Sequence, residues 1–170
     1  MKNILKVIIS VAVSAILLSC SDNFKGDIVR DSISDIPVTF DGATTAGFNP
    51  YYTVSYAAGT TSFSITLKIP DNAKLKIKEV TNIVTGSTAI NVASLNAPAG
   101  QYLTSPASVN GTSYTLSTSI TEYNTKVTAA NKISAAPAAG AFAERAFMFK
   151  LTMDDNSIIV PVQCRIRIVQ

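Results

Sequence analysis

From residue 37 to the C-terminus, apolar and polar residues alternate with a period of two. Within residues 62–69, for example, Phe, Ile and Leu at odd positions are separated by Ser, Thr and Lys at even ones. Such alternation places every second side chain on the same face of an extended chain, so it predicts β-strands with one buried face. Gly, Pro, Asn and Asp interrupt the runs, as they do at turns. The predicted strands cover residues 37–41, 51–56, 63–69, 74–78, 89–95, 112–120, 145–153 and 158–169.

These short strands, without an internal repeat, predict an all-β fold in the form of a single antiparallel β-sandwich. An immunoglobulin-like (Ig-like) sandwich is the leading form, although the Cys and Trp hallmarks of antibody domains are missing. No segment after residue 36 shows a convincing 3.6-residue period, so no helix is predicted. Residues 96–111 and 128–144 are expected to be irregular. The second segment is rich in Ala, and its length indicates either a contact surface or disordered filler.

The last two predicted strands should form a hairpin whose register follows from their apolar faces. These faces coincide when Phe147 lies opposite Cys164 and the pairing continues without a shift toward the turn. Two loops satisfy this register, a tight turn at residues 155–156 or a four-residue loop over residues 154–157. Pro161 has no N–H to donate, so we favour the longer loop and a position of this strand at a sheet edge.

The first 36 residues follow a different pattern. A short basic region with Lys2 and Lys6 precedes an apolar run over residues 7–16, which is the shape of a secretory signal peptide. A run of ten residues is too short to cross a bilayer core, which needs about 20. Residues 21–36 are polar, contain four Asp and show no sustained apolar period, so they are predicted to form a flexible tether.

The apolar run ends in Leu17-Leu18-Ser19-Cys20, which resembles the lipobox of bacterial lipoproteins, with Leu18 at a position where a smaller residue is commoner. The resemblance implies cleavage after residue 19 and lipid attachment to the sulfur of Cys20, usually with acylation of its amine. Because each buried CH2 of an acyl chain contributes about 0.8 kcal/mol, more than one chain would attach the protein stably to a membrane. The competing interpretations are an ordinary signal peptide with a chance Cys and a buried N-terminal helix.

The lipobox, the tether and the all-β body together resemble the small envelope lipoproteins of Bacteroidota, which include accessory modules of glycan-uptake systems. This resemblance is specific only over residues 1–20 and implies lipid anchoring in the outer membrane. In that group an acidic cluster directly after the Cys marks export to the cell surface, and Ser21-Asp22-Asn23 matches it only in part. The cell surface and the periplasmic face therefore both remain open. The predicted organisation is a signal peptide over residues 1–19, the lipidated Cys20 with its tether over residues 20–36, and a β-sandwich domain over residues 37–170.

Cleavage after residue 19 would also change the charge balance. The whole chain has 14 basic and 11 acidic residues, but Lys2 and Lys6 would leave with the signal peptide, so 12 basic residues would face 11 acidic ones. A nucleic-acid-binding domain is strongly basic, so no nucleic-acid partner is predicted. With Cys20 lipidated, Cys164 has no disulfide partner. Its place in an alternating run predicts a small core residue rather than a reactive thiol.

The chain contains no His, which excludes imidazole metal ligands and the Ser-His-Asp and Cys-His arrangements of hydrolases. No Gly-rich phosphate loop follows a strand and opens a helix. The Asp154-Asp155-Asn156 string lacks the Gly and the distal Glu of a calcium loop and is typical of a hairpin turn. Nothing in the sequence brings together two of the carboxylates that could support glycoside cleavage, which are Glu122, Glu144, Asp154 and Asp155. We therefore predict a protein that is not an enzyme and has no catalytic residue, metal or cofactor.

Basic side chains are one remaining group of candidates for binding. Lys74, Lys76 and Lys78 line one predicted strand, and Arg165 and Arg167 line another. If these strands are neighbours, the five side chains would form a basic strip that faces anionic lipid or polysaccharide. The favoured alternative is that the lysines protect an edge strand from unwanted pairing.

Tyrosines are the other group, because sugars and peptides both stack on exposed rings. Tyr52 and Tyr56 share a face with Val54 and are expected in the core. The tyrosines that we expect to be exposed, as candidate ligand contacts, are Tyr51, Tyr102 and Tyr123. The sequence therefore predicts a lipid-anchored, non-catalytic binding module for an extracellular glycan or protein. The alternative is a structural subunit that docks to an outer-membrane protein complex through a sheet edge.

Overall fold

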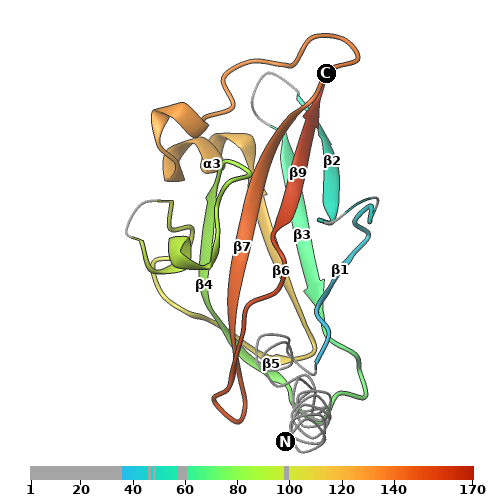
Figure 1. Cartoon of the computed structure of the whole chain (residues 1–170), viewed down its shortest axis with the longest axis vertical. Helices are drawn as coiled ribbons and strands as arrows, with labels where there is room; N and C mark the ends of the chain where they lie inside the picture. The colour runs from blue at the N-terminus through green and yellow to red at the C-terminus, as the bar shows by residue number, and fades with distance from the viewer. Residues whose placement is uncertain (1–35, 46, 48, 57–60, 98–99) are drawn as a thin grey trace, which may run out of the picture. The chain divides into compact units, whose positions relative to one another are not determined.

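Two β-sheets form the framework of the described chain (Figure 1). The computed structural model describes residues 36–170 except 46, 48, 57–60 and 98–99. Of these residues, 46% are in strands and 12% in helices. The prediction of a mostly β protein is therefore confirmed. The predicted signal peptide, Cys20 and nearly all of the tether lie outside the described residues.

The strands divide into a smaller and a larger sheet, one of which is curled into a half-barrel. The first sheet has three antiparallel strands, in the order β1 (Thr39–Asp41), β3 (Ser62–Lys68) and β6 (Ser113–Ser119). The second sheet contains, in order, β2 (Tyr51–Ser55), β9 (Cys164–Val169), β7 (Ala143–Met153), β4 (Ile77–Gly86) and β5 (Ala107–Gly111), with β8 (Ile158–Ile159) beside β7.

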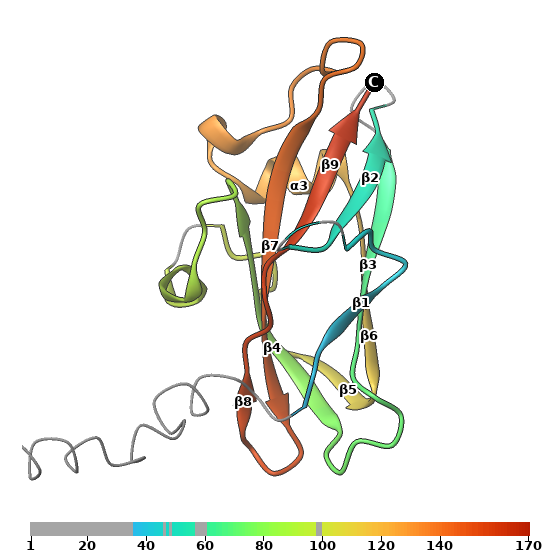
Figure 2. The same cartoon turned by 45° about the vertical axis from the view of Figure 1, so that its right-hand side comes forward.

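The prediction that all strands are antiparallel is wrong for one pair, because β2 runs parallel to β9 (Figure 2). The chain crosses from the first sheet to the second between β1 and β2, so β2 joins β9 at the edge of the second sheet. Backbone hydrogen bonds of 2.8 Å from Arg165 N–H to Pro50 O and from Tyr56 N–H to Val169 O extend this pairing at both ends. The crossing places Tyr51 beside Arg165 in the register.

The period-two pattern buries one face of each sheet against the other. Leu67 of β3 and Phe147 and Phe149 of β7 are fully buried in one shared core. Aromatic rings from both sheets meet there, since the Phe63 centroid lies 6.1 Å from that of Phe147 and the Phe40 centroid lies 5.8 Å from that of Phe149. Full burial of one large apolar side chain contributes about 1.5–3 kcal/mol, so this core is the main force that holds the sheets together.

The pairing of β7 with β9 confirms the predicted register, since Phe147 lies opposite Cys164. Cys164 is fully buried, as predicted for a small core residue. Closer to the turn, β8 pairs with β7 one residue out of the β9 register. The shift falls in residues 160–163, which belong to no strand. Pro161 lies in this segment, so its missing N–H removes no ladder bond.

The hairpin loop differs from both predicted loops. Met153 N–H donates to Ser157 O and Asn156 N–H donates to Met153 O, both at 2.9 Å, so the loop contains the three residues 154–156. Asn156 has a φ of 67°, in the left-handed region. A turn followed by one left-handed residue is a common three-residue hairpin loop, and Asn tolerates that conformation. The turn chemistry of Asn156 therefore overrides the apolar register here.

The predicted strand over residues 89–95 is wrong, because the segment contains the 3-10 helix η1 (Val92–Asn96). Asn91 and Ser94 form a capping box in which each side chain accepts a backbone N–H near the helix start. Such local bonds offer the backbone an alternative to a strand ladder. The helix contributes to a small apolar cluster on the outer face of β4 and β7, which contains Val84, Ile90, Leu95, Met148 and Val160.

Two further elements lie where the sequence predicts none. β5 occupies part of residues 96–111, and helix α3 (Ile120–Lys126) follows β6 directly. Ser119 caps α3 by accepting a hydrogen bond from Glu122 N–H at 3.1 Å. A helix of about two turns is too short to establish a 3.6-residue period, so the apolar pattern does not reveal it.

The Ala-rich segment over residues 128–144 is bound to the domain at one end. The Asn124 side chain of α3 exchanges two hydrogen bonds of 2.8 Å with the backbone of Ile133, which follows helix η2 (Ala129–Asn131). The Arg145 guanidinium donates to the carbonyls of Asn131 and Lys132 in the same segment. Residues 134–142 are mostly exposed and lead to β7. The interpretation as filler is therefore wrong for the first part of the segment.

Candidate functional site

Two of the three candidate tyrosines are core residues, so the expectation that they are exposed is wrong. Tyr102 is 3% and Tyr123 0% exposed, and their ring centroids lie 5.5 and 5.9 Å from that of Phe147. The Tyr102 hydroxyl is hydrogen-bonded to that of Thr118, and the Tyr123 hydroxyl donates to Asn131 O at 3.1 Å. Each phenol thus has its polar partner inside the domain, and neither ring is available to a ligand.

These buried groups predict a loss of stability at alkaline pH. Burial raises the pKa of Tyr102 and of Tyr123 from 10.0 to about 12, and that of the Cys164 thiol from 9.0 to about 12. All three groups are neutral when protonated, so the unfolded chain releases these protons at lower pH than the folded chain does. We expect the free energy of unfolding contributed by these groups to be constant below pH 9 and to fall between pH 9 and 12.

Urea denaturation at a series of pH values measures this dependence. Tyr123→Phe removes one of the three titrating groups, so its free energy of unfolding should fall less steeply in the alkaline range than that of the parent. The explanation is wrong if the free energy of unfolding falls with pH at the same rate in the parent and the variant.

Tyr51, the third candidate, contacts a charged cluster on the second sheet. The Arg167 guanidinium carbon lies 3.9 Å from the Tyr51 ring centroid and 4.2 Å from that of Phe142. Arg167 therefore contacts both rings. Cation–π contacts of this kind contribute about 0.5–2 kcal/mol each and fix the side chain in one orientation.

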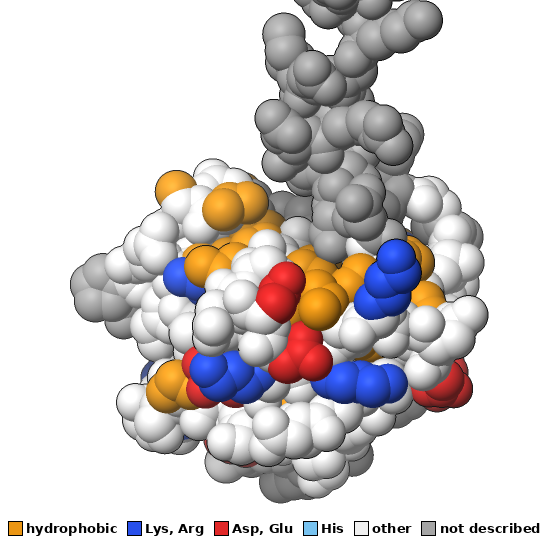
Figure 3. Space-filling model, turned by 90° about the horizontal axis from the view of Figure 1, so that it is seen from below, with side chains coloured by type: hydrophobic (Ala, Val, Ile, Leu, Met, Phe, Trp, Pro, Cys, Tyr) orange, Lys and Arg blue, Asp and Glu red, His pale blue; other side chains and the backbone are white. Residues whose placement is uncertain are grey.

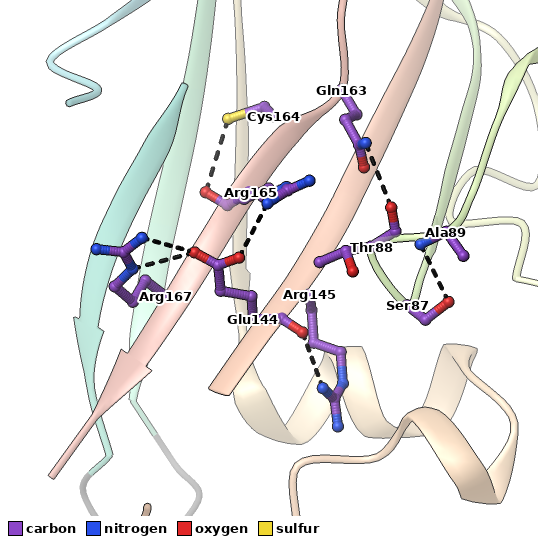
Figure 4. A network of polar contacts seen from close by, with 9 residues as sticks. All are labelled: Ser87, Thr88, Ala89, Glu144, Arg145, Gln163, Cys164, Arg165 and Arg167. Carbon is purple, nitrogen blue, oxygen red and sulfur yellow. Dashed lines mark hydrogen bonds and ion pairs between the residues drawn. The ribbon is translucent and has the colours of Figure 1, made fainter. Parts of the chain in front are cut away.

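Glu144 joins both arginines of β9 (Figure 4). Arg165 Nη1 donates to Glu144 Oε2 at 3.0 Å, and Arg167 donates to Glu144 Oε1 from Nη2 at 2.8 Å and from Nε at 3.0 Å. The three side chains are 14–29% exposed, so water screens them only in part. We call Tyr51, Phe142, Glu144, Arg165 and Arg167 the Arg–Glu–aromatic cluster.

Two buried polar atoms beside this cluster have no hydrogen-bond partner among the described residues, namely Arg165 Nε and Gln163 Oε1. The other end of the Gln163 amide donates to Thr88 O at 3.3 Å, in the loop that follows β4 (Figure 4). A buried donor or acceptor without a partner costs about 1–3 kcal/mol, so such atoms are rare in folded proteins. The cluster therefore combines charge, aromatic rings and unsatisfied polar atoms.

The predicted basic strip does not form. The strand β7 separates β4 from β9, so Lys78 and the two arginines lie on strands that are not neighbours. Lys78 Nζ instead donates to Asn156 Oδ1 of the hairpin loop at 2.9 Å. The alternative, that the lysines protect an edge, is also wrong for β4, because β4 lies between β7 and β5. Figure 3 shows that acidic, basic and apolar side chains are mixed at the lower end of the domain in Figure 1.

Three of the four carboxylates considered for catalysis have hydrogen-bond or ion-pair partners within the domain. Glu144 binds two arginines, Glu122 accepts from the Thr118 hydroxyl at 3.0 Å, and Asp155 accepts from Ser157 N–H at 2.8 Å. The hydrogen bonds that Asp155 accepts from Ser157 hold the pKa of its carboxyl group below the usual value. In the part of the chain that the structure describes, no three His, Cys, Asp or Glu side chains are grouped so that they could hold a metal ion.

An apolar hollow of about 250 Å³ lies between β1 and the irregular segment before β9. Its lining includes Phe40, Pro50 and Val162 but no charged side chain. Ligand pockets are usually larger, about 300–1,000 Å³, and add a few converging polar groups. The Arg–Glu–aromatic cluster is therefore the better candidate for a binding site.

Comparisons of the chain with protein-family models, with curated proteins and with solved structures found no match. Within the described residues, no helix has both the length and the apolar character needed to span a bilayer. The class that the fold defines is thus a mostly β domain of two packed sheets, with an ionic and aromatic cluster on the larger one.

Proposed function

We propose that this protein is a lipid-anchored, non-catalytic binding module of the outer membrane, which binds an extracellular glycan or protein through the Arg–Glu–aromatic cluster. The resemblance of Leu17-Leu18-Ser19-Cys20 to a lipobox supports the anchor. Phe142 is the observation that carries the binding proposal. Its side chain is large and apolar, yet it is 54% exposed and lies against the fixed guanidinium of Arg167.

A ring held in this way is suited to binding. Immobilising a flexible side chain costs about 0.5–1.5 kcal/mol when a ligand binds, and the stacking on Arg167 removes part of that cost in advance. An aromatic ring offers an apolar face to sugar C–H groups or to apolar peptide side chains. The neighbouring guanidinium groups add directional hydrogen-bond donors.

The arrangement of strands supports an Ig-like sandwich as the finer description of the fold. In such domains one sheet contains strands A, B and E, and the other contains G, F and C. The orders β1-β3-β6 and β9-β7-β4 follow this scheme, with β5 at the position of an additional strand beside C. By this correspondence Phe142, which directly precedes β7, lies in the connection between E and F, at the end opposite the B–C and F–G loops through which variable domains bind.

The binding proposal is tested with two matched variants of the full chain in detergent micelles. Phe142→Ala and Val162→Ala each shorten one exposed apolar side chain, with 54% and 55% exposure. On a glycan array and in envelope cross-linking, we expect Phe142→Ala to weaken capture about threefold to tenfold. Val162→Ala, which changes the apolar hollow, should bind like the parent. A loss with Val162→Ala alone would assign binding to the hollow and overturn the proposal.

The anchor has a separate test. Cys20→Ala should move the protein from the membrane fraction to the soluble fraction and abolish labelling by a radioactive lipid precursor, because the thiol that receives the lipid is removed. A variant that stays in the membrane fraction with unchanged labelling would show that the lipobox interpretation is wrong.

The free edge of β6 favours the second candidate function, a structural subunit docked to an outer-membrane protein complex. Among the described strands, β6 pairs only with β3. Ile69 N–H donates to Thr112 O and Ile120 N–H donates to Thr61 O, both at 2.9 Å. By the alternation of an antiparallel ladder, the N–H groups of Thr115 and Ser117 then point away from β3. The strand contains no Lys, Pro or charged residue that would block an added strand.

Cross-linking in intact cells separates the two functions. A single stoichiometric envelope partner that is lost in Ser117→Pro would support docking, because Pro removes an N–H that points outward from β6 and leaves the β3 ladder intact. Retention of all partners in Ser117→Pro, together with their loss in Phe142→Ala, would support binding through the cluster.

A further inference from the structure

The Arg–Glu–aromatic cluster keeps an excess of positive charge. It contains two guanidinium groups and one carboxylate, and within the described residues neither Arg165 nor Arg167 forms a second ion pair. Because the side chains are only 14–29% exposed, counterions and water compensate this charge less well than on an open surface. An anionic group of a ligand would neutralise the remaining positive charge.

The arginines also keep hydrogen-bond donors that Glu144 does not use. Arg167 binds Glu144 through Nε and Nη2, which leaves Nη1 without a protein partner among the described residues. Arg165 binds it through Nη1 only, which leaves Nη2 without a protein partner among the described residues, whereas its unpaired Nε is buried and closed to a ligand. Guanidinium N–H groups bind the two oxygens of a carboxylate in a planar, directional geometry. The unused donors therefore suit a second carboxylate.

The exposed ring of Phe142 restricts the class of ligand further. Phe142 lies 4.2 Å from the guanidinium carbon of Arg167 and is 54% exposed. A ligand that satisfies both features must present an apolar ring face and a carboxylate within a few ångströms of each other. A sugar ring with a carboxylate at C5 offers both, whereas a free phosphate lacks the apolar face and a neutral sugar offers hydroxyl acceptors but leaves the positive charge unbalanced.

We infer that the cluster binds an acidic saccharide, with the carboxylate of a uronic acid on the arginines and the C–H face of its ring on Phe142. The inference rests on the proposed function, because it names the ligand class of the same site. Glu144 acts as a positioning residue, since it holds both guanidinium groups from the side of β7.

Calorimetric titration of the full chain in detergent micelles tests the ligand class. The probes are a pentamer of galacturonic acid, its fully methyl-esterified form and an Asp-rich peptide. We expect the acidic pentamer to bind about tenfold more tightly than the ester, because charge-assisted hydrogen bonds contribute more than neutral ones. The preference should shrink as the salt concentration rises.

Arg165→Gln and Lys150→Gln form a matched pair, because each removes one positive charge from the second sheet and Lys150 has no ion pair among the described residues. Arg165→Gln should abolish the preference for the acidic pentamer, and Lys150→Gln should leave it unchanged. Circular dichroism confirms that both variants remain folded.

The outcomes separate this inference from the proposed function. Equal binding of pentamer and ester by the parent, or a preference that survives in Arg165→Gln, overturns the inference while saccharide binding stands. Binding of the peptide alone also overturns it, in favour of an acidic protein partner. If the glycan array and the cross-linking detect no ligand of any class, the proposed function itself fails.

Discussion

Phe147→Ala is expected to lower the free energy of unfolding by about 3–5 kcal/mol, the range measured for deletion of a buried aromatic ring. Phe147 is fully buried in β7. Its ring lies 5.5–6.1 Å, between centroids, from the rings of Phe63, Tyr102 and Tyr123. Phe63 belongs to β3, Tyr102 to the segment before β5 and Tyr123 to α3, so the ring connects both sheets and the helix. Its removal would leave a cavity that three separate elements would have to close.

Urea denaturation at neutral pH measures this effect, with Phe142→Ala as the control because it makes the same chemical change at a ring that is 54% exposed. The control should lose no more than about 2 kcal/mol, from the stacking on Arg167. Since natural domains are stable by only about 5–15 kcal/mol, Phe147→Ala should be close to unfolding while the control is not. A similar loss in both variants would contradict the assignment of Phe147 to the centre of the core.

Gly100→Ala is expected to destabilise the domain by more than the usual penalty for a left-handed non-Gly residue, which is about 1–3 kcal/mol. Gly100 has a φ of +78°, and a Cβ added there would lie 2.6 Å from Thr85 O. That carbonyl cannot easily move, because Thr85 N–H donates to Gly100 O at 2.9 Å and joins the two segments. The variant must therefore accept both the backbone strain and a steric clash.

Gly140→Ala separates these two contributions. Gly140 has the same φ of +78°, but an added Cβ would meet no atom within 4 Å. Its loss of stability should reflect the backbone strain alone, so the difference between the two variants measures the close approach at Gly100. Equal midpoints of urea unfolding for the two variants would contradict this prediction. They would show that the backbone at residues 85 and 100 moves apart without a loss of stability.

Sequence reasoning predicts the strands well where alternation is long. Residues 62–68 alternate over seven positions, and residues 113–117 alternate around Tyr114 and Leu116; the structure confirms both strands. It fails where local hydrogen bonds compete with the ladder, as in the capping box of Asn91 that starts η1. It also fails for α3, whose seven residues are too few to reveal a helical period.

The candidate site could be predicted only in pieces. Tyr51 is expected as an exposed ring, Glu144 as a possible acid and the two arginines as part of a basic strip, but nothing in the sequence connects them. Phe142 is missed altogether, because it stands at the end of the Ala-rich segment and outside any alternating run. The alternation of Arg165, Ile166 and Arg167 shows that the arginines share one face, but it does not say which strands lie beside them.

The sequence alone determines which side of each strand is buried, because a period of two assigns every residue to one of two faces. It also determines the lipobox-like string at Cys20 and the core position of Cys164. Only the tertiary structure decides that β2 pairs in parallel with β9 and that Tyr102 and Tyr123 are buried. The choice of neighbouring strand depends on how two apolar faces pack across the whole domain, and this long-range packing brings Tyr51, Phe142 and Glu144 to the two arginines of β9.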